Sequence, residues 1–282
     1  MNRKKMLVTT RNARFQQWQS FLSNRTKRSR AGLFLIQGVR PLNVALDRDW
    51  PIEAILHRVG GGALSEWARD VTNRAGVEHI GVSTDLMAEL GEKSGTVPEV
   101  IAVARTRHPR LRDVHLAAAP PLVVVFDRPT SPGNLGTLIR TADAFGADAV
   151  VVVGHGADPY DPQAVRASTG SLFALPVVTV SSVDEVLAFR DSWRGRGTDM
   201  TVVGTDETGS VVIDGHDFTT GTMLVVGNET KGMSAAWRQG CDVVVNIPIG
   251  GAASSLGAPS AGAVGLYEIA RQRRQGCCRQ ES

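Results

Sequence analysis

The sequence has few cysteines and no long apolar run, and both shortages narrow the class of protein. Its 282 residues contain three cysteines, at positions 241, 277 and 278, without the even number or regular spacing of a disulfide framework. No apolar stretch approaches the roughly 18 residues needed to span a membrane. The first ten residues also hold too few apolar side chains for a secretory signal peptide. We therefore expect a cytoplasmic protein that does not enter a membrane.

Clustered metal ligands are missing as well. Cys277 and Cys278 are adjacent and near the terminus, which indicates free thiols rather than a metal site. The six histidines lie at scattered positions without ligand spacing: 57, 79, 108, 115, 155 and 216. We expect no metal.

Acidic residues are absent from the first 46 positions, which contain ten Lys and Arg residues. The rest of the chain carries 21 basic and 28 acidic residues, a net charge of −7. A basic front on an acidic body favours a polyanionic partner such as nucleic acid. A solvated basic segment without a ligand remains an alternative, and the spacing of Phe15, Trp18 and Phe21 also suits a helix face that packs inward.

Apolar patterning predicts an α/β chain with two domains. In the front half we predict strands at 33–38, 51–56, 77–82 and 100–104, and helices at 14–22, 41–46, 64–75 and 84–90. In the second half, solid apolar strands are predicted at 122–126, 149–153, 223–226 and 243–247, with helices at 135–145 and 183–193. Such uninterrupted β-branched runs are typical of a parallel sheet buried on both faces. We predict domains at 1–108 and 121–282, joined by a linker at 109–120.

The first segment that could carry chemistry is Asp127–Gly146. It leaves a buried strand, turns through Pro132-Gly133 and enters a helix that carries Asn134 and Arg140. Strand–turn–helix junctions at the carboxyl edge of a parallel sheet are common ligand sites, and a helix N-terminus can receive an anion. From this segment alone, an ordinary connection between strand and helix fits equally well.

Two further segments are rich in small residues. Val225–Met233 is a strand followed by a glycine-rich turn with Glu229; it is not a P-loop, because Lys231 is not followed by Ser or Thr. Ile247–Glu268 is a strand, a long stretch of small residues and a helix, and we interpret the small residues as allowing main-chain contact with a ligand. A capping or solvated Glu229 and a flexible surface loop are the alternatives.

In order and spacing, these segments resemble the three motifs of the SpoU (TrmH-like) RNA ribose methyltransferases of the SPOUT class. The first motif, N-x-G-x-x-x-R, matches Asn134, Gly136 and Arg140, and the second, G-x-E-x-x-G, matches Gly227, Glu229 and Gly232. The third, I-P-M-x-G…S-L-N, matches Ile247, Pro248, Gly251, Ser255 and Leu256. Arg166–Ser171 also resembles the family. Phe34–Arg40 is similar to the F-x-x-x-G-x-R opening of the family's L30e-like substrate-binding domain.

The resemblance implies a fold, a cofactor and a reaction. The fold is a C-terminal SPOUT domain with a parallel sheet and a trefoil knot, preceded by a small L30e-like domain, in a homodimer. S-adenosyl-L-methionine is the implied methyl donor, and the residues expected to bind it are Gly227, Ile247, Leu256 and Thr205. A ribose 2′-hydroxyl of RNA is the implied acceptor, and the catalytic residues expected around it are Asn134, Arg140, Glu229 and Ser255. Because a guanidinium hardly deprotonates, we expect Arg140 to bind the adjacent phosphate rather than act as a base.

The front domain is similar to that of members acting on 23S ribosomal RNA, including antibiotic-resistance methyltransferases, so 23S rRNA is the expected substrate and tRNA the alternative. Gly257 stands where the family has asparagine. A non-catalytic RNA-binding remnant of the family is therefore a second alternative. A Rossmann-type nucleotide enzyme using Gly154 and Gly156 is a third, although a lone G-x-G without a further glycine is a weak signal.

Overall fold

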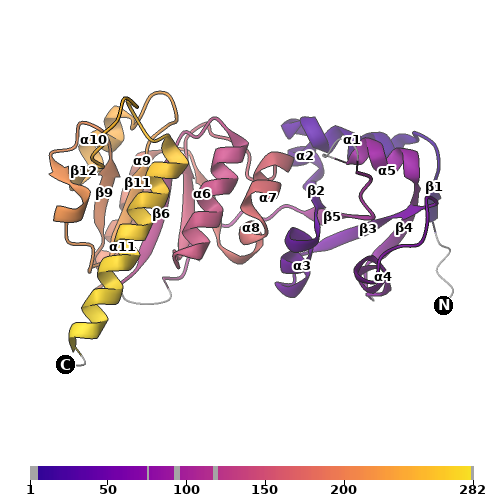
Figure 1. The fold of residues 1–282 in the computed structure, drawn as a ribbon, viewed down its shortest axis with the longest axis horizontal. Helices are drawn as coiled ribbons and strands as arrows, with labels where there is room; N and C mark the ends of the chain where they lie inside the picture. The colour runs from indigo at the N-terminus through magenta and orange to yellow at the C-terminus, as the bar shows by residue number, and fades with distance from the viewer. Residues whose placement is uncertain (1–5, 75, 92–95, 117–119, 281–282) are drawn as a thin grey trace. The chain divides into compact units, whose positions relative to one another are not determined.

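The computed structural model describes residues 6–74, 76–91, 96–116 and 120–280, without the side chains of 277–280. Arg3, Lys4 and Lys5 of the basic front, residue 75 and residues 117–119 of the predicted linker lie outside the described residues. The chain forms two compact units (Figure 1): Met1–Arg107 with Tyr160–Ala174, and His108–Pro159 with Leu175–Ser282. Within the described ranges, no helix is long and apolar enough to cross a membrane.

The first unit is a five-stranded sheet in the order β1-β4-β3-β5-β2. Its strands are β1 (Met6–Val8), β2 (Leu33–Gln37), β3 (Ile52–Val59), β4 (Glu78–Ser83) and β5 (Val100–Arg105). β1, β4 and β3 are parallel, and β5 is antiparallel to β3 and β2. The helices are α1 (Ala13–Ser23), α2 (Arg25–Ala31), α3 (Val39–Asp47), α4 (Glu66–Asn73) and α5 (Thr84–Leu90). Figure 1 shows α1, α2 and α5 on one face of the sheet and α3 and α4 on the other.

Helix α1 packs against the sheet through its aromatic side chains. Phe15, Trp18 and Phe21 are 0%, 3% and 1% exposed and belong to one core cluster with β-strand residues such as Leu35 and Leu56. The side chain of Asn12 caps the helix by accepting a hydrogen bond from the Phe15 N–H at 3.0 Å. The spacing of three in the sequence therefore marks an inward face, and the predicted helix is confirmed.

Tyr160–Ala174 completes the first unit, although it lies in the second half of the sequence and within the predicted second domain, 121–282. It forms α7 (Pro162–Ser168) and α8 (Ser171–Ala174), and α7 lies beside the edge strand β2. The rings of Tyr160 and Phe34 are 4.7 Å apart, and those of Phe173 and Trp50 are 5.1 Å apart in an edge-to-face arrangement. Because an uncovered edge strand can pair with another chain, this segment protects β2 as well as extending the core.

The second unit is a parallel sheet of seven strands in the order β10-β12-β9-β11-β6-β7-β8. The strands are β6 (Leu122–Asp127), β7 (Ala149–Val153), β8 (Val177–Val180), β9 (Thr201–Thr205), β10 (Val211–Val212), β11 (Thr222–Val226) and β12 (Val243–Asn246). All residues of β6, β7 and β11 are buried. The predicted parallel sheet is therefore confirmed, and its central strands are covered on both faces.

Helices cover both faces of this sheet. α6 (Pro132–Ala144) and α11 (Ala258–Gln280) pack side by side on one face, and α9 (Val183–Arg194) and α10 (Ala235–Gly240) lie on the other (Figure 1). Glycines allow α11 to approach closely: a Cβ on Gly262 would lie 2.6 Å from Leu138 of α6, and one on Gly265 would lie 3.1 Å from Leu224 of β11. These two glycines serve helix packing, so our interpretation of the whole small-residue stretch as ligand-contacting is wrong for them.

Candidate active site

A cavity of about 400 Å³ opens at the carboxyl ends of β9, β11 and β12. All four residues expected to bind the cofactor line it: Thr205, Gly227, Ile247 and Leu256. Of the residues expected to be catalytic, Glu229 and Ser255 also line it. The cavity therefore lies at the edge of the parallel sheet where α/β proteins bind ligands.

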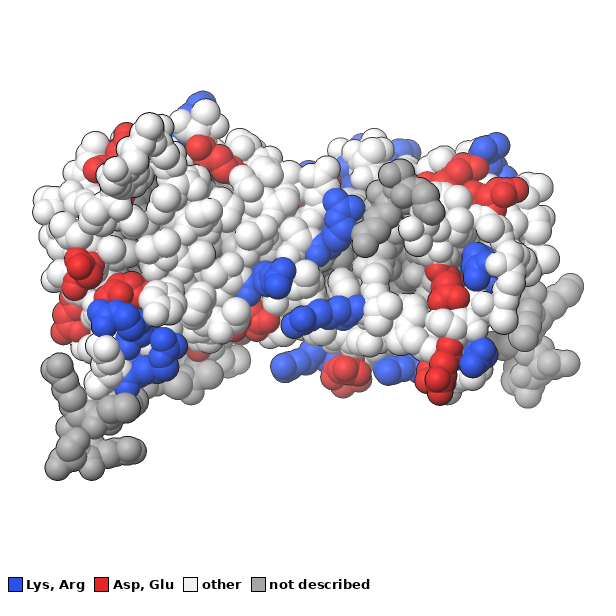
Figure 2. Space-filling model, viewed as in Figure 1, with Lys and Arg blue, Asp and Glu red and all other residues white. Residues whose placement is uncertain are grey.

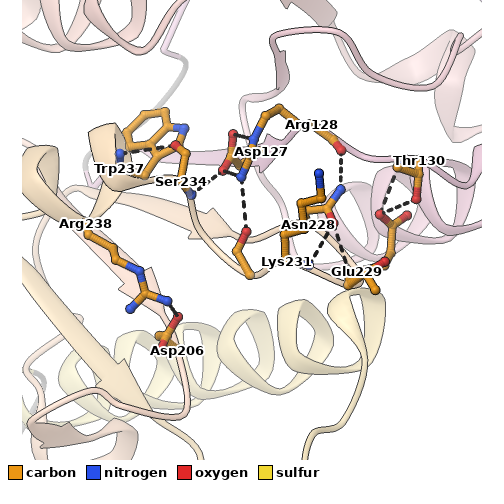
Figure 3. A network of polar contacts seen from close by, with 12 residues as sticks. Asp127, Arg128, Thr130, Asp206, Asn228, Glu229, Lys231, Ser234, Trp237 and Arg238 are labelled. Atoms are coloured by element: carbon orange, nitrogen blue, oxygen red, sulfur yellow. Dashed lines mark hydrogen bonds and ion pairs between the residues drawn. The ribbon is translucent and has the colours of Figure 1, made fainter.

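Glu229 joins the second motif to the first. Its carboxylate accepts hydrogen bonds from the N–H and hydroxyl of Thr130, both at 2.9 Å (Figure 3). It also accepts from the Ser131 N–H at 3.0 Å and from the Asn134 amide at 3.2 Å. Burial raises the pKa of Glu229, but the backbone hydrogen bonds from Thr130 and Ser131 outweigh it, so the pKa lies below its ordinary value. The side chain is thus an ionised acceptor with its oxygens already in use, and Asn134 is brought to the cavity edge through it.

The glycines of the second motif are required by a tight turn. A Cβ on Gly227 would lie 2.5 Å from the Met233 nitrogen and 2.6 Å from the carbonyl carbon of Gly232. Gly232 itself has φ +63°, in the left-handed region. Backbone hydrogen bonds of 3.0 Å link Asn228 and Gly232 in both directions. The turn therefore presents main chain to the cavity.

A polar network fastens this turn to the end of β6 (Figure 3). The buried Asp127 carboxylate accepts hydrogen bonds from Arg128 Nε at 3.0 Å and from the Ser234 N–H at 2.7 Å. The Asn228 amide donates to the Arg128 carbonyl at 2.6 Å. Arg128 has φ +50°, an unusual conformation for a non-glycine residue, which these contacts and Gly232 hold in place. Sequence analysis missed this network; the only signal was the position of Asp127 at the end of a buried strand.

One wall of the cavity carries an ion pair that was also missed. Arg238 of α10 lies 2.8 Å from Asp206, whose side chain is 6% exposed. Burial raises the pKa of Asp206, but hydrogen bonds from the Thr208 hydroxyl and N–H reverse the effect and lower it. Arg238 and Asp206 therefore neutralise each other within the cavity wall.

The segment from Ile247 to Gly257 closes the other side of the cavity. Ser254, Ser255, Leu256 and Gly257 line it and are exposed. Gly257 has φ +75°, and no atom lies within 4 Å of the position that its Cβ would occupy. The left-handed backbone is one that asparagine tolerates better than most residues, so the site has both the conformation and the space for the family's asparagine.

Two expected catalytic residues, Asn134 and Arg140, are absent from the cavity lining; Asn134 is hydrogen-bonded to the lining residue Glu229, whereas Arg140 is not. Arg140 lies on the exposed side of α6. Among the described residues, no hydrogen bond or ion pair holds its guanidinium. The guanidinium fork is thus available to bind something else.

Comparison with known proteins agrees with this architecture. The model of the SpoU rRNA Methylase family matches residues 121–267, and that of the SpoU L30e-like domain matches residues 12–102. The 23S rRNA (uridine(2479)-2′-O)-methyltransferase of Streptomyces viridochromogenes is 49% identical over 269 residues, which cover 95% of this chain and 93% of that protein.

Solved structures give the same result. The crystal structure of the SpoU methyltransferase AviRb from Streptomyces viridochromogenes in complex with AdoMet superposes with a TM-score of 0.89 and 50% identity, covering 94% of this chain and 99% of the other. The AdoMet-bound rRNA methyltransferase from Sinorhizobium meliloti gives 0.80 and 28%, with 94% and 97% coverage.

The fold and the site define a two-part α/β protein: an L30e-like unit, followed by a unit with a ligand cavity at the edge of a parallel sheet. The chain belongs to the SpoU rRNA methylase family.

Proposed function

We propose that the protein transfers the methyl group of S-adenosyl-L-methionine to a ribose 2′-hydroxyl of 23S ribosomal RNA. The observation that carries the proposal is the cavity at the ends of β9, β11 and β12, which collects the cofactor residues expected from the family motifs. The likeness to a 23S rRNA 2′-O-methyltransferase over nearly the whole chain supports 23S rRNA, rather than tRNA, as the substrate.

The cavity fits the cofactor in size and lining. Its volume of about 400 Å³ is within the usual range for cofactor pockets. Ile247, Leu256 and Ala261 offer apolar surface for an adenine ring, and the tight turn at Gly227 offers main-chain groups. When bound, the cofactor supplies an electrophilic methyl group on a sulfonium.

The chain's own residues would align the acceptor and stabilise its developing negative charge. Glu229 holds the turn after β6 against the cavity, which keeps Asn134 at its edge. Ser255, exposed on the cavity lining, can hydrogen-bond the ribose. Arg140 provides a fork for the phosphate beside the reacting nucleotide.

A homodimer would explain the position of Arg140. The face formed by α6 and the first half of α11 shows few charged side chains (Figure 2), and it exposes Tyr267 by 52% and Val264 by 37%. A second copy seated on this face would bring the Arg140 of one subunit towards the cavity of the other. We propose a symmetric dimer through α6 and α11, as the resemblance implies.

We also propose the family's trefoil knot. β12 lies outside β9 in the sheet, whereas α11 packs on β11 and α6. The segment between them, residues 247–257, must therefore cross the strand ends that form the cavity, which is the crossing that a knot needs. Knots are otherwise almost absent from proteins.

We also propose that the enzyme acts in the cytoplasm, as the choice of ribosomal RNA as substrate implies. Protection of the ribosome against an antibiotic stays a prediction from the resemblance. Inhibitory concentrations of ribosome-directed antibiotics for cells with and without the gene would test it.

Incubation of the protein with 23S rRNA and radiolabelled cofactor, followed by mapping of 2′-O-methyl positions, tests the proposed function. One labelled ribose is the expected result. Cofactor binding without transfer to either 23S rRNA or tRNA would instead favour the non-catalytic remnant, for which the absence of the family asparagine at Gly257 is the specific observation.

A further inference from the structure

We infer that the edge of the first unit along α7 is the surface that docks the RNA backbone. Four exposed basic residues lie along it, and we call them the basic stripe: Lys27 and Arg30 of α2, Arg40 of α3 and Arg166 of α7. The inference rests on the proposed function for its choice of RNA as partner, and it names the residues that would hold that RNA.

Ion pairs engage several other basic residues of the first unit. The arginines engaged by carboxylates, each with its N···O distance, are Arg11 with Glu89 (2.6 Å), Arg14 with Glu78 (2.5 Å), Arg58 with Glu99 (3.6 Å), Arg74 with Asp47 (3.9 Å) and Arg105 with Glu53 (2.7 Å). In the part of the chain that the structure describes, no such partner holds the side chains of Lys27, Arg30 or Arg40. The unit's own carboxylates thus leave these three cations available to an external anion.

Helix α2 is built to present positive charge. Its sequence, Arg25–Ala31, contains four basic residues and no acid. One of the four, Arg28, is buried: it donates to the Phe21 carbonyl at 2.7 Å and to the Asp161 carboxylate at 3.1 Å. Arg28 thus joins α2 to Asp161, the N-cap residue of α7. This contact holds α2, and with it Lys27 and Arg30, beside α7.

Helix α7 continues the stripe towards α3. It begins beside α2 at Asp161, and it leads to Gly170, whose Cβ position is 2.8 Å from Val44 and 3.6 Å from the Arg40 carbonyl. Arg166 is exposed between these two ends. The stripe therefore combines residues from the front of the sequence with one residue from its second half.

The surrounding charge agrees with this assignment. Figure 2 shows basic side chains gathered over α3 and the α7–α8 segment, whereas over α4 and α5 basic and acidic side chains alternate. Arginine forks and a lysine ammonium are the groups that bind phosphate oxygens, and they do so without reading bases. The stripe would therefore supply affinity and position, while the reacting nucleotide is selected elsewhere.

The test compares two triple variants of the full chain with 23S rRNA transcribed in vitro. One is Lys27→Gln, Arg30→Gln, Arg40→Gln. The control is Arg11→Gln, Arg69→Gln, Arg74→Gln, which removes the same charge from α4, from the residue that caps its C-terminus and from the segment before α1. For the stripe variant we expect the KM for RNA to rise at least tenfold with kcat unchanged. The slope of log affinity against log salt should fall by about 2 to 3, because each lost phosphate contact removes about 0.7 to 0.9. Arg166→Gln alone should lower it by about 1.

Circular dichroism and cofactor titration establish that each variant folds. Equal KM and equal salt slope for the stripe and control variants would overturn the inference while leaving methyl transfer, and so the proposed function, intact. The proposed function would be refuted if the wild-type protein transferred no methyl group to the RNA. The docking surface would still stand if that protein bound the RNA and only the stripe variant lowered the salt slope.

Discussion

Glu229 accepts hydrogen bonds from the backbone N–H and the hydroxyl of Thr130, each at 2.9 Å, although the two residues are 99 positions apart in the chain. The contact fastens the turn after β11 to the turn after β6. Both turns would therefore shift if the carboxylate were lost, and the cavity edge would shift with them.

We expect Glu229→Gln to lower the free energy of unfolding by about 1 to 3 kcal/mol at pH 7, because an amide cannot accept all the hydrogen bonds that the carboxylate accepts. The folded-state pKa of Glu229 lies below its ordinary value, so its stabilisation is present above the unfolded pKa and is lost as pH falls through the folded pKa. Urea denaturation at several pH values should show that the difference in free energy of unfolding between wild type and variant becomes smaller as the pH falls. Glu207→Gln, an exposed change on the same cavity, is the control; a difference that is independent of pH would contradict this account.

Gly227→Ala should abolish cofactor binding. The added Cβ would lie 2.5 Å from the Met233 nitrogen, so the turn that forms one side of the cavity must open. Isothermal titration with S-adenosyl-L-methionine measures the loss. Gly250→Ala provides the matched control, since no atom lies within 4 Å of its Cβ position. Retained affinity in Gly227→Ala would show that this turn is not part of the cofactor site.

Gly257→Asn should leave the free energy of unfolding within about 1 kcal/mol of wild type, because the site is open and asparagine tolerates its positive φ. Gly257→Val, with a β-branched side chain at the same φ, should destabilise more. We expect the asparagine to raise kcat several-fold without changing the KM for cofactor. An unchanged kcat would mean that the backbone at this position is sufficient for the reaction.

Arg140→Ala should reduce kcat/KM about a hundredfold or more with the melting temperature unchanged, because the side chain is exposed and, among the described residues, no hydrogen bond or ion pair holds it. The kcat/KM of Arg140→Lys should lie between those of wild type and Arg140→Ala, since lysine keeps the charge but lacks the two-pronged fork. Thr137→Ala, one turn earlier on the exposed side of α6, serves as control. Near-normal transfer by Arg140→Ala would remove this residue from the mechanism.

Asp161→Asn should destabilise the protein by about 3 to 5 kcal/mol, because it removes the negative charge from the side chain to which the buried Arg28 guanidinium donates at 3.1 Å. The double change Arg28→Met, Asp161→Asn should recover part of the loss, since the buried charge is then gone. Chemical denaturation followed by tryptophan fluorescence measures both. If the double variant were no more stable than Asp161→Asn, the cost would not come from the buried charge.

Elements with a strong apolar period could be predicted from sequence, and those made by capping or by buried polar groups could not. The helix at Phe15, Trp18 and Phe21 and the solid strands β6, β7 and β11 were predicted because burial fixes their pattern. Helix α2 was missed, since its sequence has no apolar stripe; the Asn24 cap, the left-handed Gly32 and the buried Arg28 form it instead.

The same division holds for the site. The residues that the resemblance implied for the cofactor do line one cavity, because family motifs are short local runs such as the tight glycine turn at Gly227. The carboxylates at Asp127 and Asp206 could not, because their partners Ser234 and Arg238 are distant in sequence and come together only in the folded sheet. Hydrogen-bond networks of this kind have no short-range pattern to read.

The insertion of Tyr160–Ala174 into the first unit has a consequence for how this gene can change. A recombination event that exchanged the sequence before residue 108 would deliver a partner lacking the complementary surface for α7, Tyr160 and Phe173. The edge strand of the new front domain would be covered by an α7–α8 segment that did not evolve with it, and that segment would no longer have its original packing partners. The two halves are therefore expected to be inherited together, and chimaeras that join relatives of this family should also carry over residues 160–174 from the donor of the front domain.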